Sequence, residues 1–189
     1  HQITGATFGA SLLAFVCFSL VASSVYLFND LLDLGADRAH PRKRRRPLAA
    51  GDLSIIKGSL MAPGLLGLGL LLGLVLGLKF LAVLMAYFVA TAAYSLVLKR
   101  HLVIDICALA LLFSARIVAG GAATGIPLSV WLLAFAIFFF LSLAAVKRQA
   151  ELVDARAAGR EPSGRAYRVE DIGLVASMAL ASGYMSVLV

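Results

Sequence analysis

Four oxygen-bearing side chains gather where the first apolar run of the sequence ends. Asn29, Asp33 and Asp37 recur every four residues, and Asp30 lies three residues before Asp33. In a helix this spacing places all four on or near one face. Carboxylates this close repel one another unless a cation joins them, and hard oxygen ligands suit Mg²⁺, which takes further ligands from water and substrate phosphates. The spacing therefore predicts a magnesium site formed by these four residues.

Basic side chains follow the acidic ones within a few positions. The run Arg42–Arg46 is continuous, and Arg38 precedes it. Such a run can set membrane topology or contact anionic lipids, but Arg and Lys also bind phosphate oxygens. We single out Arg38, Lys43 and Arg46 as phosphate ligands for their places in the pattern Asp-Arg-x-His-Pro-x-Lys-x-x-Arg-Pro. Together the two clusters predict a site for a magnesium-bound phosphate or diphosphate.

A second charged group follows the fifth apolar run. Glu151 lies three residues after Arg148 and four after Lys147. One interpretation is an intrahelical salt bridge, worth only a few tenths of a kcal/mol. We favour a functional role, because this group falls on the membrane face predicted for the acidic cluster. Glu151 would then lie near a second cation, and Lys147 and Arg148 would bind phosphate.

Three further polar residues lie within or beside apolar runs. Asp105 and Arg116 share one helix face, about three turns apart. An arginine inside an apolar span should face a cavity or a partner, so Arg116 either holds a phosphate or pairs with an acid on another helix. Tyr94 is either an interfacial anchor or part of the site. We include Arg116 and Tyr94 among the candidate substrate-binding residues.

The composition indicates an integral membrane protein. Of the 189 residues, 61% are hydrophobic and 14% are charged, against roughly 25% charged residues in soluble domains. The net charge of +7 does not indicate nucleic-acid binding, because the basic residues sit in a few loops between apolar runs. Cys17 and Cys107 lie in such runs without metal-binding spacing, and we interpret both as packing residues.

Six apolar runs are long enough to cross a bilayer. They span residues 5–28, 55–77, 80–98, 103–122, 128–146 and 171–189. In the second run Gly69, Gly73 and Gly77 recur every four residues and predict a close helix contact. We expect Asp52 or Ser54 to cap that helix and Lys79 to mark a tight turn after it. The fold class predicted is therefore all-α, a polytopic transmembrane helix bundle. The sequence shows no signal peptide, does not begin with Met and ends inside an apolar run. We expect residues 1–189 to be a single transmembrane domain, truncated at both ends.

The loop charges predict the orientation. Fifteen of the seventeen Lys and Arg residues fall in 29–57, 99–100 and 147–170, and with six spans these loops alternate onto one face. The positive-inside rule makes that face cytoplasmic. We therefore expect a multi-pass protein of the plasma (inner) membrane, with the two most charged loops closing over one cavity on the cytoplasmic side.

The segment NDLLDLGAD resembles NDxxDxxxD, the first aspartate-rich motif of the UbiA superfamily of membrane prenyltransferases. The continuation DRAHPRKRRRPLAAG, the stretch from Tyr94, SARIVAGGAATGIPLSVWLL and LAAVKRQAEL resemble the decaprenyl-phosphate phosphoribosyltransferase branch. The similarity covers about residues 20–155, in the same order. One departure is KRQAELVD, which stands where aromatic prenyltransferases carry a second Asp-rich motif. Its extra positive charge suits a donor with an additional phosphate.

The resemblance implies about nine spans around a central cavity open to lipid, of which six are present here, and Mg²⁺ held between two acidic motifs. Carried onto this sequence, Asn29, Asp30, Asp33 and Asp37 would bind metal and diphosphate, with Asp30, Asp33, Asp37 and Glu151 as the catalytic acids. Arg38, Lys43 and Arg46 would bind phosphate, and Lys147, Arg148 and Glu151 would form the second half-site. A polar stretch around Arg165, Tyr167 and Arg168 matches only loosely.

Two classes of function remain open. The first is a Mg²⁺-dependent transferase acting on pyrophosphate donors: it would move 5-phosphoribosyl from phosphoribosyl pyrophosphate to a polyprenyl phosphate, a cell-wall precursor lipid, or alternatively a polyprenyl group from its diphosphate to an aromatic acceptor. The second is an ion-coupled transporter. A transporter predicts charges near the membrane midplane, whereas most charges here lie at one face, so we favour the transferase.

Overall fold

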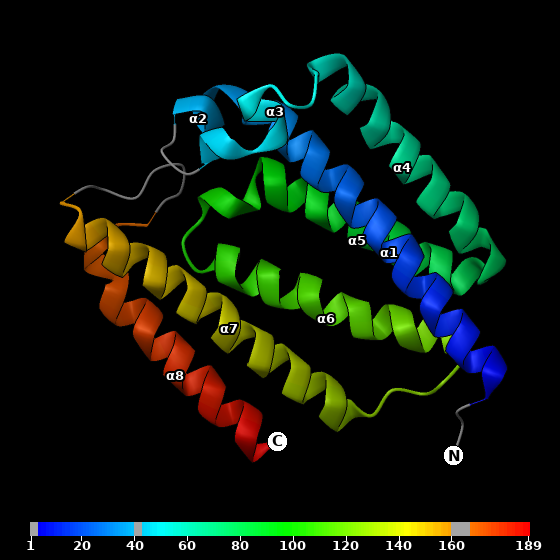
Figure 1. Cartoon of the computed structure of the whole chain (residues 1–189). Coiled ribbons are helices and arrows are strands. Elements are labelled where there is room, and N and C mark those ends of the chain that lie inside the picture. Colours follow the sequence, from blue (N-terminus) through cyan, green and yellow to red (C-terminus); the bar gives the residue numbers. More distant parts are fainter. Residues whose placement is uncertain (1–3, 40–42, 160–166) are drawn as a thin grey trace. The chain divides into compact units, whose positions relative to one another are not determined.

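The computed structural model describes residues 4–39, 43–159 and 167–189, and the secondary structure of these residues is helical (Figure 1). Six long helices are present: α1 (Gly5–Leu32), α4 (Ile55–Val75), α5 (Leu78–Leu96), α6 (Ile104–Thr124), α7 (Val130–Ala157) and α8 (Ile172–Leu188). All six are long and apolar enough to cross a membrane. The all-α, multi-span prediction is confirmed.

Two short helices and three 3₁₀ turns connect the long ones. The helices are α2 (Leu34–Ala39) and α3 (Pro47–Ala50), and the turns are Lys43–Arg45, Leu98–Arg100 and Val169–Asp171. Ser54 caps α4 as expected, its hydroxyl accepting from the Lys57 amide at 3.3 Å. Because α2, the Lys43–Arg45 turn and α3 lie between α1 and α4, this connection is more ordered than an irregular loop.

The chain divides into two compact units. The first comprises residues 1–89 and 122–125, and the second comprises 90–121 and 126–189. The acidic cluster with its basic run belongs to the first unit, and the group around Arg148 belongs to the second. Each unit therefore positions its own set of charged side chains.

The first unit is built on α1 and α4, which lie side by side (Figure 1). Gly69 faces α1 so closely that a Cβ there would lie 2.9 Å from Val21 and 3.2 Å from the Cys17 carbonyl oxygen. The Ser24 hydroxyl also donates to the Ala62 carbonyl at 2.6 Å. Gly69 thus lies in a tight helix seam, as its spacing in the sequence predicts.

The close helix contact predicted at Gly69, Gly73 and Gly77 includes Gly73 but not Gly77. A Cβ at Gly73 would lie 3.2 Å from Leu84, so this residue packs closely, whereas Gly77 has no such neighbour and adopts a φ of +94°. Gly77 forms the turn between α4 and α5, and Lys79 already lies inside α5. The sequence prediction assigned Gly77 to the packing seam and the turn to Lys79, and both assignments are wrong. A left-handed backbone at this turn favours glycine.

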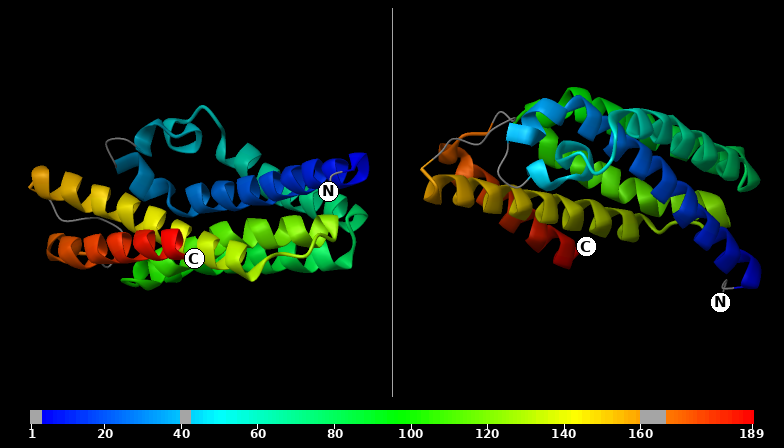
Figure 2. Two further views of the ribbon diagram at one scale, coloured as in Figure 1. Left: turned by 90° about the horizontal axis from the view of Figure 1, so that it is seen from below. Right: turned by 45° about the horizontal axis from the view of Figure 1, so that its top comes forward.

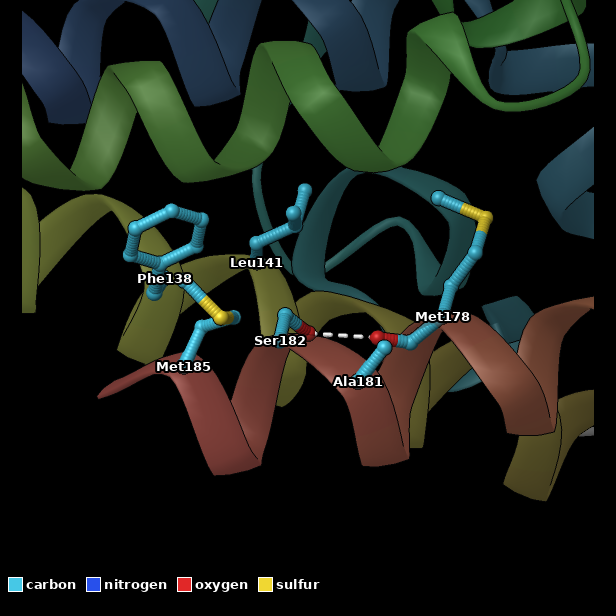
Figure 3. Close-up of a pocket in the computed structure, with 6 residues that line it drawn as sticks. All are labelled: Phe138, Leu141, Met178, Ala181, Ser182 and Met185. Carbon is cyan, nitrogen blue, oxygen red and sulfur yellow. Dashed lines mark hydrogen bonds between the residues drawn. The ribbon is translucent and has the colours of Figure 1, made fainter. Parts of the chain in front are cut away.

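The second unit is built on α7 and α8, which run antiparallel side by side (Figures 1 and 2). Their core is continuous with α6: Ile106, Ala145, Leu152 and Val175 are each at most 1% exposed. An apolar hollow of about 250 Å³ lies beside this core. Its lining residues include Ser182, whose hydroxyl donates to the Met178 carbonyl at 2.5 Å (Figure 3). None of its lining residues is charged, so the hollow is not part of the charged group of this unit.

Candidate active site

The acidic segment bends but keeps its helical hydrogen bonds. α1 ends at Leu32 and α2 begins at Leu34, with Asp33 between them as the C-cap. Even so, the Asp33 amide donates to the Asn29 carbonyl at 2.9 Å and the Asp37 amide to the Asp33 carbonyl at 2.8 Å. The four-residue spacing therefore remains a helical spacing across the junction.

Arg46 joins two of the predicted carboxylates. Its Nη1 donates to Asp30 Oδ1 and to Asp37 Oδ2, both at 2.7 Å. Lys43 Nζ lies 3.8 Å from the other oxygen of Asp37. The basic run reaches back to the acidic helix end because the 3₁₀ turn and α3, with Pro47 in its first turn, fold against α2.

The predicted residues of this unit differ in exposure. Asp37 is 2% exposed, Asn29, Asp30 and Asp33 are half-buried, and Arg38 is exposed. The structure thus brings Asp30, Asp37, Lys43 and Arg46 into contact, with Asn29 and Asp33 on the same stretch of helix. Arg42, which belongs to the basic run, lies outside the described residues.

The chemistry of this cluster suits a divalent cation. Asp37 Oδ1 is buried and, within the described part of the chain, accepts no hydrogen bond. Carboxylate and amide oxygens are the ligands that Mg²⁺ prefers, and Mg²⁺ often binds through one or two carboxylates while substrate phosphates supply the rest. No three His, Cys, Asp or Glu side chains among residues 4–39, 43–159 and 167–189 form a complete metal site. The residues therefore fit an ion that shares its coordination with a phosphate ligand.

The second unit holds a buried ionic network centred on Asp105. This carboxylate is 0% exposed. Tyr94 on α5 donates its hydroxyl to Asp105 Oδ1 at 2.8 Å, and Arg148 Nη2 on α7 lies 2.7 Å from Oδ2. Arg148 Nη1 also pairs with Glu151 one turn along α7. A single arginine therefore joins a fully buried carboxylate to an exposed one.

Tyr167 closes this network on one side. It is 3% exposed, and its ring lies 5.4 Å from Arg148 Cζ, within the range of a cation–π contact. Burial, together with the negative charge of Asp105, raises the pKa of the Tyr167 hydroxyl to about 12. The phenol is therefore neutral at physiological pH. Arg165, close to it in sequence, lies outside the described residues.

The other predicted basic residues of this unit are exposed. Arg116 places its guanidinium 4.7 Å from the centre of the Phe113 ring, and Phe113 stacks on Phe140 at 5.3 Å. Lys147 is exposed beside the buried Arg148. The two neighbours on α7 are thus in opposite environments, although the sequence assigned them the same role.

Sequence reasoning did not include two residues of this network in the predicted site. Asp105 was noted only as sharing a helix face with Arg116, whereas it pairs with Arg148 on another helix. Tyr167 was given little weight because its surroundings match the family loosely. The available signal for Asp105 was an acidic residue at the start of an apolar span, which is costly in a membrane unless it has a partner or a task.

The sequence profile of the UbiA prenyltransferase family matches residues 2–188. This chain belongs to that family. It is 46% identical over 151 residues to the decaprenyl-phosphate phosphoribosyltransferase of Mycolicibacterium smegmatis, covering 78% of this chain and 46% of that protein. It is 37% identical over 176 residues to the nodulation protein NoeC of Azorhizobium caulinodans, covering 93% of this chain and 57% of that protein. The chain thus spans about half the length of these two relatives.

A solved UbiA homologue from Archaeoglobus fulgidus, bound to DMAPP and Mg²⁺, has the same fold as this UbiA-family chain. The TM-score is 0.82 with 18% sequence identity, over 99% of this chain and 67% of that one. The six long helices are therefore the multi-pass membrane helices of a UbiA-type fold, and the resemblance inferred from the aspartate-rich motif is confirmed.

Proposed function

We propose that the protein transfers a 5-phosphoribosyl group from phosphoribosyl pyrophosphate to a polyprenyl phosphate, with Mg²⁺ as cofactor. The observation that carries this proposal is the Asp30–Arg46–Asp37 cluster at the end of the membrane-length helix α1. The cluster combines carboxylates that could bind a metal with basic side chains that could bind phosphate. It lies where the apolar part of α1 ends and the polar connection begins. The 46% identity to a decaprenyl-phosphate phosphoribosyltransferase supports the choice of donor and acceptor.

In this proposal the first unit binds the diphosphate of the donor. Asn29, Asp30, Asp33 and Asp37 hold the cation, and Arg38, Lys43 and Arg46 meet the phosphate oxygens. When bound, Mg²⁺ neutralises the charge that builds on the departing pyrophosphate. Arg46 bridges Asp30 and Asp37 in the structure, so these two carboxylates would have to release Arg46 to hold a cation, and Arg46 would then be available to a phosphate oxygen. The basic side chains then stabilise the leaving group electrostatically as the ribose anomeric carbon is attacked.

The second unit contributes Glu151 near a cation, and Lys147 and Arg116 toward substrate. Tyr94, predicted from the sequence as a substrate-binding residue, donates its hydroxyl to Asp105 and acts through that carboxylate. The acceptor phosphate is already an anion at neutral pH and attacks without a general base. Its prenyl tail stays in the bilayer, as the many exposed apolar side chains on the six long helices allow. The protein then needs only to orient two anions and screen their repulsion.

A second candidate is transfer of a prenyl group from its diphosphate to an aromatic acceptor. The observation that favours it is the fold shared with a UbiA homologue solved with DMAPP. The residues that bind the diphosphate would be the same, and only the group transferred would differ. Membership of a prenyltransferase family, by contrast, gives no support to an ion-coupled transporter.

The experiment uses membranes containing the full-length protein. They are incubated with labelled phosphoribosyl pyrophosphate and polyprenyl phosphate, or with labelled prenyl diphosphate and an aromatic acceptor, each with and without EDTA. We expect phosphoribosyl label to move into the lipid fraction with the first pair, no labelled prenyl-aromatic product to form with the second pair, and no transfer after EDTA. Transfer from the prenyl diphosphate alone would replace our proposal with the second candidate, and turnover undiminished by EDTA would exclude the metal role.

A further inference from the structure

The residue two positions before Asp105 has a strained backbone. Val103 has a φ of +68°, and across it the Ile104 amide donates to the Leu102 carbonyl at 2.7 Å. This is a γ-turn of the rare left-handed kind, at a β-branched residue that strongly disfavours it. Such strain is unfavourable and persists only where the surroundings impose it, often at functional sites. Asp105, two residues later, is held by Tyr94 and Arg148.

Asp105 ties three helices of the second unit together. It begins α6, accepts from Tyr94 on α5 and pairs with Arg148 on α7. A carboxylate without partners in this apolar interior would be strongly unfavourable, and the tyrosine and arginine offset that cost. Moving Asp105 would therefore disturb all three helices at once.

Arg148 has little capacity left for a phosphate. Its guanidinium is 2% exposed and contacts two carboxylates. Its Nε is buried too, so a phosphate oxygen could reach it only after a rearrangement. Glu151, at the other end of the ion pair, has a side chain that is 48% exposed. Of this linked pair, Glu151 is the group that an external ligand can approach.

We propose that Asp105 is a positioning residue, which holds the Arg148 guanidinium so that Arg148 fixes the direction of the Glu151 carboxylate. This inference rests on the proposed function and replaces the role that the sequence predicted for one residue: Arg148 orients an acidic group and is not itself a phosphate ligand. Arg148 pairs with both Asp105 and Glu151, and two carboxylates with one guanidinium leave one net negative charge, which suits a cation at the exposed Glu151. The strained turn at Val103 sets where Asp105 enters the network.

The test is a double-mutant cycle read by binding, with the full-length protein in detergent. The probe is inorganic pyrophosphate in the presence of Mg²⁺, titrated into wild type, Asp105→Asn, Glu151→Gln and the double variant. We expect Asp105→Asn to weaken binding at least about tenfold in the wild-type background and less than about twofold in the Glu151→Gln background, because neighbours in one network couple. An equal loss in both backgrounds would overturn the inference, since Asp105 would then act independently of Glu151.

Melting temperatures identify variants that fail to fold. The matched control is Glu170→Gln, which removes an exposed acidic charge in the same unit and should leave binding unchanged.

If Asp105→Asn does not fold, Tyr94→Phe replaces it: the variant loses one hydrogen bond to Asp105 but no charge. We expect a smaller loss of about two- to fivefold that again vanishes with Glu151→Gln, and persistence of that loss would overturn the inference. Absence of pyrophosphate binding by the wild type would refute the proposed function itself, and this inference with it.

Discussion

Among the described residues, the buried carboxylates are Asp37 and Asp105. Each forms an ion pair with an arginine. The sequence predicted the first, because its four-residue spacing from Asn29 and Asp33 carries a local signal. It did not predict that Asp105 would pair with Arg148, since that contact joins two helices whose approach no local pattern encodes. Residue type and spacing thus identify candidate groups, and packing decides their partners.

Asp33→Asn tests the acidic cluster. Asp33 links α1 to α2 and is half-buried, and the amide keeps its size while removing the charge that a cation needs. We expect turnover to fall at least about 100-fold, in the range measured when one electrostatic contact to a transition state is lost, with an unchanged melting temperature. Asp52→Asn, an exposed aspartate of the same unit, is the matched control. A variant of Asp33 with near-full activity would exclude its role.

Tyr167→Phe tests whether the buried Tyr167 hydroxyl contributes to the pH dependence of the free energy of unfolding. Burial and the Asp105 charge raise the Tyr167 pKa to about 12, above the value near 10 of an unfolded tyrosine. The folded state therefore holds the proton more tightly, and this contribution to stability is complete below pH 10 and lost as pH rises through 12. We expect wild type to lose on the order of 2 kcal/mol over that interval beyond the loss seen in Tyr167→Phe.

The measurement is the free energy of unfolding between pH 9 and pH 12 in detergent. Tyr26→Phe removes a tyrosine that is 70% exposed and should decline in parallel with wild type. An identical decline for wild type and Tyr167→Phe would mean that the Tyr167 hydroxyl does not titrate differently in the folded state.

At the scale of elements, the sequence predicted six membrane spans and the described residues contain six, but the predicted ends of two of them were too early. The expected runs stopped at residues 28 and 146, whereas α1 continues to Leu32 and α7 to Ala157. Hydropathy marks where side chains become polar, and a helix continues past that point because its backbone hydrogen bonds do not depend on side-chain polarity. No Gly or Pro interrupts either extension. The candidate residues Asn29 and Asp30 on α1, and Lys147, Arg148 and Glu151 on α7, consequently lie on helices and not in loops.

Gly69→Ala tests the seam between α1 and α4. The added Cβ would lie 2.9 Å from Val21 and 3.2 Å from the backbone oxygen of Cys17, which cannot move aside as a side chain can. We expect a loss of about 1–3 kcal/mol in the free energy of unfolding, typical of overpacking. Gly67→Ala, in the same helix with nothing within 4 Å, should be neutral or gain up to about 1 kcal/mol in helix propensity. Unfolding in mixed detergent with SDS measures both; equal effects would contradict a tight seam.

At the scale of the whole molecule, the charges of the sequence make one further prediction. The basic residues of 29–57, 99–100 and 147–170 should lie on the cytoplasmic side of the membrane. With Cys17 and Cys107 replaced by Ser, a cysteine at Arg44 should be inaccessible to a membrane-impermeant maleimide in intact cells, and one at Ser129 should react. The reverse pattern would invert the orientation, and labelling of both positions would contradict the number of spans between them.

Because α7 is one unbroken helix, its length sets how far Glu151 lies from the apolar part of the helix. From Val130 to Val146 the helix is apolar, about 26 Å at 1.5 Å per residue, close to the thickness of the hydrocarbon layer. With Val130–Val146 across the hydrocarbon layer, Glu151 would follow roughly 7 Å further along, at the level of the lipid headgroups. A long-chain lipid phosphate resting in its own leaflet is already at this height. Such a molecule could be processed by lateral diffusion alone, without extraction from the bilayer.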